Sequence, residues 1–198
     1  MTESLAPETD LPVPQRFTQD VLGWVPWLEP LREADLGERH FEALVQRSRA
    51  KNAYFRLLAR DPAVLRARTL ADFDIFFNVA EGLPRADREI AATAASRGNG
   101  CVYCASVHAG FAAHHSGRRD DVQRLLEGGT GARIDPRWDA VVDASVALSQ
   151  SPPALGSDEL RALDAAGLDD LEVLDTIMSA AFFNWANRLM LSLGEPTL

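Results

Sequence analysis

Lysine, cysteine and long apolar runs are all scarce in this chain of 198 residues. Lys51 is its only lysine, and 29 acidic residues against 20 Lys and Arg give a formal net charge of -9. Binding to phosphate backbones or anionic membranes without sequence preference relies on clustered basic side chains. We therefore expect neither nucleic acid nor a membrane as a partner.

Signals for export and membrane insertion are also missing. The first ten residues carry acidic side chains and lack the basic start and apolar run of a secretory signal. No apolar stretch reaches the length of a transmembrane helix. We expect a cytoplasmic protein.

Runs of β-branched residues bounded by turns do not occur either, so no strand is predicted. Apolar residues recur instead at helical spacing. We predict an all-α fold, with residues 1–15 as a mobile N-terminal tail and residues 16–198 as a single helical domain. The expected helices are 37–60 (one helix or two), 62 to about 81, 85–97, 101–115, 120–126, 138–148, 157–166 and 169–193.

Capping residues and glycines indicate where several of these helices begin and end. Asp61 and Pro62 suit the cap and first position of a helix, and Pro84 opens the next one. The run 98–100, Gly-Asn-Gly, ends that helix. Asn99 or Gly100 is expected to cap the following helix, which places Cys101 in its first turn.

The two cysteines form the motif Cys101-x-x-Cys104-x-x-x-His108. In a reducing compartment such a pair is more often catalytic, redox-sensing or metal-binding than structural. At about 100° per residue, Cys104 and His108 return to the helix face of Cys101. Unpaired N–H groups of the first turn favour a Cys101 thiolate. His108, one turn after Cys104, is placed to take the proton of that thiol.

This arrangement suits peroxide reduction or thiol exchange. One sulfur attacks and is oxidised to a sulfenic acid, the other resolves it as a disulfide, and a dithiol donor restores the pair. A Glu89 carboxylate folded back beside His108 would orient the ring, although the spacing fits a solvated Glu89 equally well.

Two other interpretations of the motif remain. Cys101, Cys104 and His108, with Glu89 as a fourth ligand, would suit zinc, but the chain has no second cysteine pair. The same residues would also suit a redox-sensing helical oligomer without peroxide turnover.

The run 83–90 followed by 96–108 resembles the alkylhydroperoxidase D-like, or carboxymuconolactone decarboxylase, superfamily, and within it the peroxidase-related members. The motif is a glutamate twelve residues before Cys-x-x-Cys-x-x-x-His, and residues 181–188 resemble the last helix of the family. The resemblance implies an all-α fold and assembly into trimers or hexamers. It also implies a Glu89–water–His108 proton relay that activates Cys104, with Cys101 as its partner, whereas the helix dipole favours Cys101 as the more acidic thiol.

Tyr103 departs from alkylhydroperoxidase D proper, which has a histidine just before the second cysteine. A phenol is a poor base at neutral pH, so we assign Tyr103 a supporting role. The decarboxylase branch lacks the cysteine pair. We therefore predict a thiol-dependent peroxidase with catalytic Cys101, Cys104, His108 and Glu89, which needs no cofactor or metal. Its partners would be an organic hydroperoxide or hydrogen peroxide, a dithiol electron donor and further copies of the chain.

Overall fold

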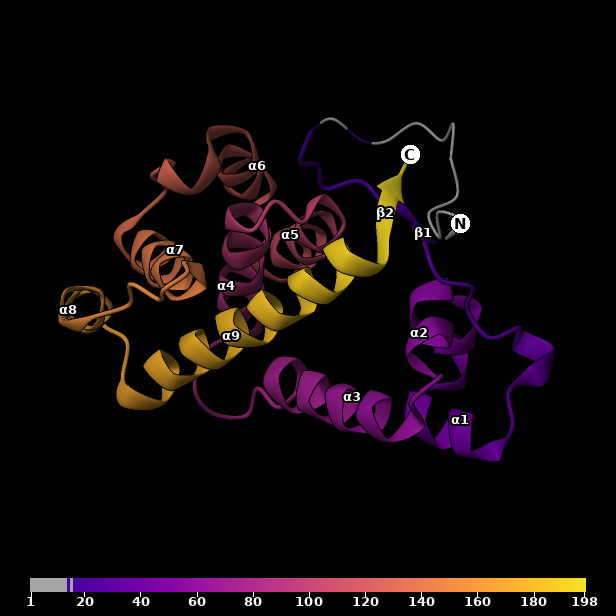
Figure 1. The fold of residues 1–198 in the computed structure, drawn as a ribbon. Coiled ribbons are helices and arrows are strands. Elements are labelled where there is room, and N and C mark those ends of the chain that lie inside the picture. Colours follow the sequence, from indigo (N-terminus) through magenta and orange to yellow (C-terminus); the bar gives the residue numbers. More distant parts are fainter. Residues whose placement is uncertain (1–13, 15) are drawn as a thin grey trace.

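Helices make up nearly all the regular structure of the computed structural model, which describes Pro14 and residues 16–198 (Figure 1). The predicted all-α fold is confirmed. The α-helices are α1 (Glu38–Leu44), α2 (Ala53–Leu58), α3 (Pro62–Phe77), α4 (Arg85–Gly98), α5 (Val102–Ser116), α6 (Arg119–Gly128), α7 (Pro136–Ser149), α8 (Ser157–Ala165) and α9 (Asp170–Leu193). Three 3-10 helices, η1 (Glu33–Asp35), η2 (Arg47–Lys51) and η3 (Gly129–Gly131), and two strands, β1 (Gly23–Pro26) and β2 (Gly194–Thr197), complete the described elements.

Helix α4 is the central element, and it packs against α5, α7 and α9 (Figure 1). Residues 87–96 of this helix are all buried. Its small side chains let the neighbouring helices approach closely, and four of them are fully buried alanines: Ala91, Ala92, Ala94 and Ala95. The central position of α4 places Glu89 in the protein interior.

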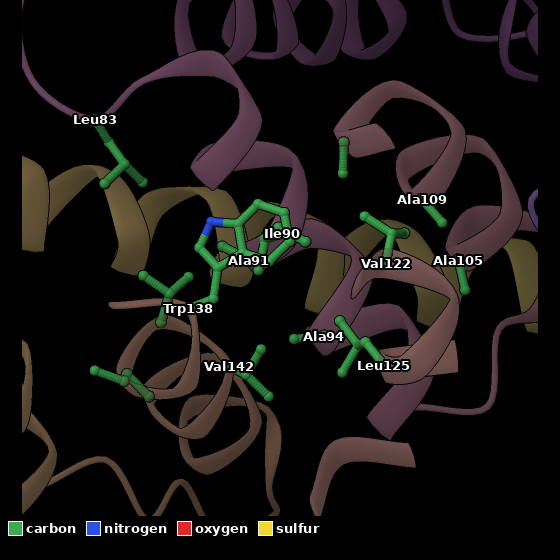
Figure 2. Packing of buried hydrophobic residues seen from close by; sticks show 14 of the residues in the cluster. Leu83, Ile90, Ala91, Ala94, Ala105, Ala109, Val122, Leu125, Trp138 and Val142 are labelled. Atoms are coloured by element: carbon green, nitrogen blue, oxygen red, sulfur yellow. The ribbon is translucent and has the colours of Figure 1, made fainter. Parts of the chain in front are cut away.

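A large hydrophobic cluster fills the space between α4, α5, α6 and α7 (Figure 2). Trp138 of α7 belongs to this cluster together with Ile90 of α4. The buried indole Nε1 of Trp138 donates to Asp87 at 2.8 Å, and Arg137 donates to the other oxygen of the same carboxylate at 2.8 Å. These bonds satisfy the buried polar groups and attach α7 to the first turn of α4.

The connection from α3 to α4 differs from the prediction, because α3 ends at Phe77 and not near residue 81. Buried Arg88 explains the difference. Its guanidinium donates to the carbonyl oxygens of Ile75, Glu81 and Leu83 at 2.7, 3.0 and 2.5 Å. It also forms an ion pair with Asp175 of α9 at 2.7 Å. The carbonyls of this segment therefore bond to a side chain and not to a continuing helix.

Residues 37–60 form two α-helices separated by the 3-10 helix η2. Helix α1 ends at Leu44, and its C-cap Val45 has a non-helical φ of 62°. A new cap starts α2, because the side chain of Asn52 accepts the N–H of Tyr54 at 2.9 Å. Arg56 holds the carbonyl oxygens of Leu31 and Ala50 at 2.9 and 2.8 Å. These bonds accompany the division of the segment into two helices, one of the two arrangements that its apolar spacing predicts.

The pairing of β1 with β2 was not predicted. The strands are antiparallel, with Gly23 opposite Thr197 and Pro26 opposite Gly194. A Cβ atom on Gly194 would collide with the Trp24 ring and the Val25 carbonyl, so glycine permits the close approach. Each strand has four residues, and the two strands come from opposite ends of the chain. Such a pair leaves no local signal in the sequence.

The predicted mobile tail, residues 1–15, falls outside the described residues except for Pro14, which is buried. The assignment of residues 16–198 to a single domain stays a prediction. Among the helices that the structure describes, none combines the length and apolar composition needed to cross a membrane.

Candidate active site

The turn between α4 and α5 presents the first cysteine. Gly100 adopts φ +77°, and the N–H of Gly100 bonds to the Arg97 carbonyl at 3.3 Å. The N–H of Cys101 bonds to the Ser96 carbonyl at 2.9 Å. This pair of bonds is the Schellman ending of a helix. Asn99 is therefore the C-cap of α4, and the predicted cap of α5 at Asn99 or Gly100 is wrong: Cys101 is itself the N-cap, and α5 begins at Val102.

Helix α9 supports this turn through asparagines. Buried Asn187 donates to the Ser96 hydroxyl at 3.0 Å. Its side-chain oxygen accepts from Asn99 at 3.0 Å, and Asn99 also donates to Asn184 at 3.1 Å. The amide of Asn187 further interacts with both cysteine sulfurs. The position of the thiol pair thus depends on α9 as well as on the motif itself.

The sulfurs of Cys101 and Cys104 lie 2.8 Å apart, and both cysteines are free and buried. The hydrogen bond from the Cys104 thiol lowers the pKa of Cys101 against the opposing effect of burial, and the Cys104 backbone N–H in the first turn of α5 helps. The same hydrogen bond and burial raise the pKa of Cys104 well above its usual value. Cys101 is thus the more acidic thiol, mainly because of its hydrogen bond with the Cys104 thiol and in smaller part because of the helix terminus.

Glu89 lies against His108. Its Oε2 is 2.5 Å from His108 Nδ1, and its Oε1 accepts from Arg85 Nε at 2.6 Å. The Glu89 side chain is fully buried, and His108 is 9% exposed. Spacing left a solvated Glu89 open, and the central position of α4 rules that alternative out. A hydrogen bond at Nδ1 leaves Nε2 as the ring nitrogen free to exchange a proton.

Aromatic rings hold these groups in place. The His108 ring contacts Phe183 of α9 with centroids 3.8 Å apart, and Phe76 of α3 at 5.5 Å. The Arg85 guanidinium lies 4.3 Å from the Phe77 ring centroid. Helices α3 and α9 therefore enclose the proton-transferring groups that α4 and α5 carry.

A cavity of about 360 Å³ opens onto this site. Cys104, His108, Glu89 and Tyr103 all line it. Cys101 lines a separate cavity of about 190 Å³, whose walls include Trp24 and Gly194. The thiols thus belong to a buried hydrophobic cluster, and each of them lines a cavity.

Tyr103 lines both cavities. Burial raises the pKa of its phenol, while an interaction with Asn52 opposes the shift. The hydroxyl therefore remains protonated at neutral pH and is not a base. The zinc interpretation lacks structural support, because the described residues include no group of three or more His, Cys, Asp or Glu that could hold a metal ion.

The site also contains residues that were not predicted from the sequence. Arg85 had one available signal, its position four residues before Glu89 on the same helix. Tyr54, Arg49 and Arg68 also line the larger cavity, and Asn187 contacts the sulfurs. These four come from other elements, so their spacing in the sequence carried no signal.

The fold and the site together define an all-helical protein with a buried dithiol beside a glutamate–histidine pair. The family model for the carboxymuconolactone decarboxylase family matches residues 62–150, which include all four predicted catalytic residues. The matched segment is less than half of the chain, so it shows that this part of the chain is similar to that family.

Solved structures share this fold along most of the chain. An uncharacterized peroxidase-related protein from Ralstonia eutropha JMP134, described as an alkylhydroperoxidase AhpD core, is 20% identical with a TM-score of 0.71, covering 88% of this chain and 90% of its own. A peroxidase-related protein from Silicibacter sp. TM1040 is 21% identical with a TM-score of 0.66, covering 93% and 92%. The debrominase Bmp8 is 17% identical with a TM-score of 0.68, covering 83% and 88%. At these identities the shared property is the fold. No curated protein sequence matches the chain.

Proposed function

We propose that this protein is a thiol-dependent peroxidase that reduces an organic hydroperoxide or hydrogen peroxide with the Cys101–Cys104 pair. One observation carries the proposal: two sulfurs 2.8 Å apart, one of which shares a cavity with the Glu89–His108 pair. A disulfide bond is about 2.05 Å long, so a small side-chain movement closes it. The peroxidase-related proteins with this fold agree with the proposal.

Cys104 makes the first attack in this mechanism because it lines the larger cavity. As its sulfur attacks the outer peroxide oxygen, its proton passes to the adjacent Cys101 thiolate. The O–O bond breaks, Cys104 becomes a sulfenic acid, and His108 protonates the leaving alkoxide. Glu89 stabilises the imidazolium that supplies this proton.

Cys101 then attacks the Cys104 sulfur and releases water. Overall, the Cys104 thiol, the Cys101 thiolate, the proton of His108 and one hydroperoxide give a disulfide, an alcohol and water, so the two sulfurs lose two electrons. A dithiol donor reduces the disulfide through a mixed disulfide. We place the protein in the cytoplasm, where such donors keep thiol pairs reduced.

Steady-state consumption of cumene hydroperoxide with a dithiol donor tests this function. Cys101→Ser and Cys104→Ser should each lower turnover by about 100-fold or more, because each lacks one sulfur of the cycle. His114→Gln, an exposed histidine on the same helix, is the matched control. A stoichiometric peroxide dose should remove two hydrogen atoms per chain by mass spectrometry. Equal turnover in wild type and both cysteine variants would contradict the mechanism.

A redox-sensing oligomer is the second candidate, and the burial of both thiols favours it. Cys101 is 2% and Cys104 5% exposed, which would slow turnover but not a slow stoichiometric oxidation. Chromatography of reduced and oxidised protein separates the two functions. A change of assembly on oxidation with negligible peroxide turnover would favour the sensor.

We also propose that the protein is a homo-oligomer, with three or six subunits as the family resemblance implies. Helix α9 carries an outward-facing apolar stripe that supports assembly. The stripe consists of Leu171, Leu174, Met178 and Trp185, which are 42%, 52%, 47% and 43% exposed.

A further inference from the structure

The cavity beside Cys104 has a second polar group that the peroxidase mechanism does not use. Arg49 of η2, Arg68 of α3 and Tyr54 of α2 all line it. The two arginines share one carboxylate oxygen of Asp72, at 3.2 and 3.1 Å. The side chains of Arg68 and Arg49 are 8% and 14% exposed, and Tyr54 is 6% exposed. Three elements thus bring these polar groups together away from bulk water.

Three buried polar atoms of this group make no hydrogen bond of good geometry among the described residues: Arg49 Nη1, Arg68 Nε and the Tyr54 hydroxyl, although that hydroxyl interacts with the Arg68 side chain. Buried polar groups in folded proteins nearly always have partners, so three unpaired ones on a single cavity wall point to a ligand. Two of the atoms are obligate donors and the third is a hydroxyl. The missing partner is therefore an acceptor.

The charges lining the cavity indicate an anion. Arg85 and Glu89 pair with each other, which leaves Arg49 and Arg68 to share Asp72. In the proposed mechanism the imidazolium of His108 and the thiolate of Cys101 offset each other, so one positive charge is in excess, in a chain whose formal net charge is -9. Burial lowers the pKa of Arg49, and the neighbouring charge of Arg68 opposes its protonation further. A bound anion would relieve both effects.

The anion would lie close to the reactive sulfur. Arg68, Cys104 and Tyr54 line the same cavity, and the positive charge of Arg68 opposes the increase in the pKa of both Cys104 and Tyr54. Burial nevertheless raises the pKa of Tyr54 to about 12, which keeps its hydroxyl protonated and able to donate. Apolar side chains form much of the remaining wall, among them Phe55, Phe76, Phe183 and Met190.

We propose that the cavity binds a hydroperoxide that carries one carboxylate and an aromatic or branched apolar body. The carboxylate contacts Arg49, Arg68 and Tyr54, and the peroxide group lies next to the sulfur of Cys104. A planar carboxylate offers two oxygens to converging guanidinium donors. Its single charge matches the one excess cation, whereas a phosphate dianion would leave the site negative. A volume of about 360 Å³ suits a small molecule. This substrate class rests on the proposed function, but the carboxylate site itself does not.

Binding is measured first, without any turnover. Isothermal titration of the reduced full-length protein compares para-isopropylbenzoate with the neutral para-isopropylbenzamide. The carboxylate should bind about tenfold more tightly or better, since its charged hydrogen bonds are stronger than those of the amide. Arg68→Gln should abolish the preference. Tyr54→Phe should reduce it severalfold with the ring packing preserved, so its result stands even if Arg68→Gln fails to fold.

Arg133→Gln is the matched control, because Arg133 forms an exposed ion pair with Asp143 and lines none of this cavity. Turnover is then compared for cumene hydroperoxide and its para-carboxylate, and the carboxylate should have the lower KM. Equal affinity of wild type for benzoate and benzamide would overturn the inference. A preference for the carboxylate without peroxide turnover would support the carboxylate site and refute the proposed function. Turnover of both peroxides with the same KM would support the proposed function and refute the carboxylate site.

Discussion

A hydrogen bond joins the sulfurs of Cys101 and Cys104, and the proton shared in it sets their relative acidity. The Cys104 thiol donates this proton to Cys101 and lowers the pKa of Cys101, although burial acts in the opposite direction. Cys101 is therefore ionised at a lower pH than a free cysteine, and Cys104 at a higher one. Cys101 is therefore the more acidic thiol, whereas Cys104 is the thiol that lines the larger cavity.

Removing the Cys104 thiol should reverse the decrease in the pKa of Cys101. In Cys104→Ala, Cys101 keeps its burial but loses the hydrogen bond, so its pKa should rise. Thiolate absorbance followed against pH measures the midpoint. At a given pH near neutrality the variant should contain less Cys101 thiolate than wild type. An unchanged or lower midpoint would contradict the shared-proton description.

Glu89 offers a second prediction for a single residue. Glu89→Gln keeps the shape but removes the charge that faces His108 and Arg85. We expect kcat/KM for peroxide to fall by about 10- to 100-fold, as for other side chains that orient a catalytic histidine. Stability should fall by about 1–3 kcal/mol, because Arg85 loses its charged partner.

Steady-state kinetics and urea unfolding check both effects, and Glu127→Gln, on the exposed side of α6, controls for loss of one negative charge. A Glu89→Gln enzyme with wild-type kcat/KM would remove Glu89 from the proposed mechanism.

Among the elements, the α4–α5 turn has the most direct effect on the site. Gly100 adopts a left-handed conformation with φ +77°, and a Cβ added there would meet nothing within 4 Å. Gly117, at the end of α5, has φ +70° and equally open surroundings. The two glycines thus differ mainly in their distance along the helix from Cys101.

These two glycines allow a matched comparison. Gly100→Ala and Gly117→Ala should each destabilise the protein by about 1 kcal/mol, the cost of left-handed backbone for alanine. Only Gly100→Ala should alter the rate at which Cys101 is alkylated, because the bond from Cys101 to Ser96 depends on this turn. Urea unfolding and thiol labelling measure the two quantities. Equal labelling rates in both variants would show that the turn does not position the thiol.

For the whole molecule, the exposed stripe on α9 predicts assembly. Met178→Glu places a charge in the middle of the stripe and should lower the molecular mass measured by light scattering. Leu160→Glu, an equally conspicuous exposed leucine on α8, should leave the mass unchanged. A monomeric wild type, or a Met178→Glu protein of unchanged mass, would argue against assembly through α9.

Much of the helical architecture could be predicted because its signals are local. Asp61 caps α3 by accepting the N–H of Val64, and Asp169 caps α9 by accepting that of Glu172. Cys101, Cys104 and His108 belong to one short motif, so helix geometry alone places them on one face. Interactions within four residues along the chain are sufficient for all of these features.

The sequence by itself determined the helical class and the thiol–imidazole motif, because each depends on neighbours along the chain. Only the tertiary structure decided that Glu89 is buried against His108, that Asn187 contacts the thiols, and that Arg49 and Arg68 converge beside Cys104. Those contacts join separate helices, and their formation depends on how alanine-rich α4 packs at the centre of the protein. Spacing along the chain does not predict contacts between different helices, because the packing of the helices sets the distances between their residues.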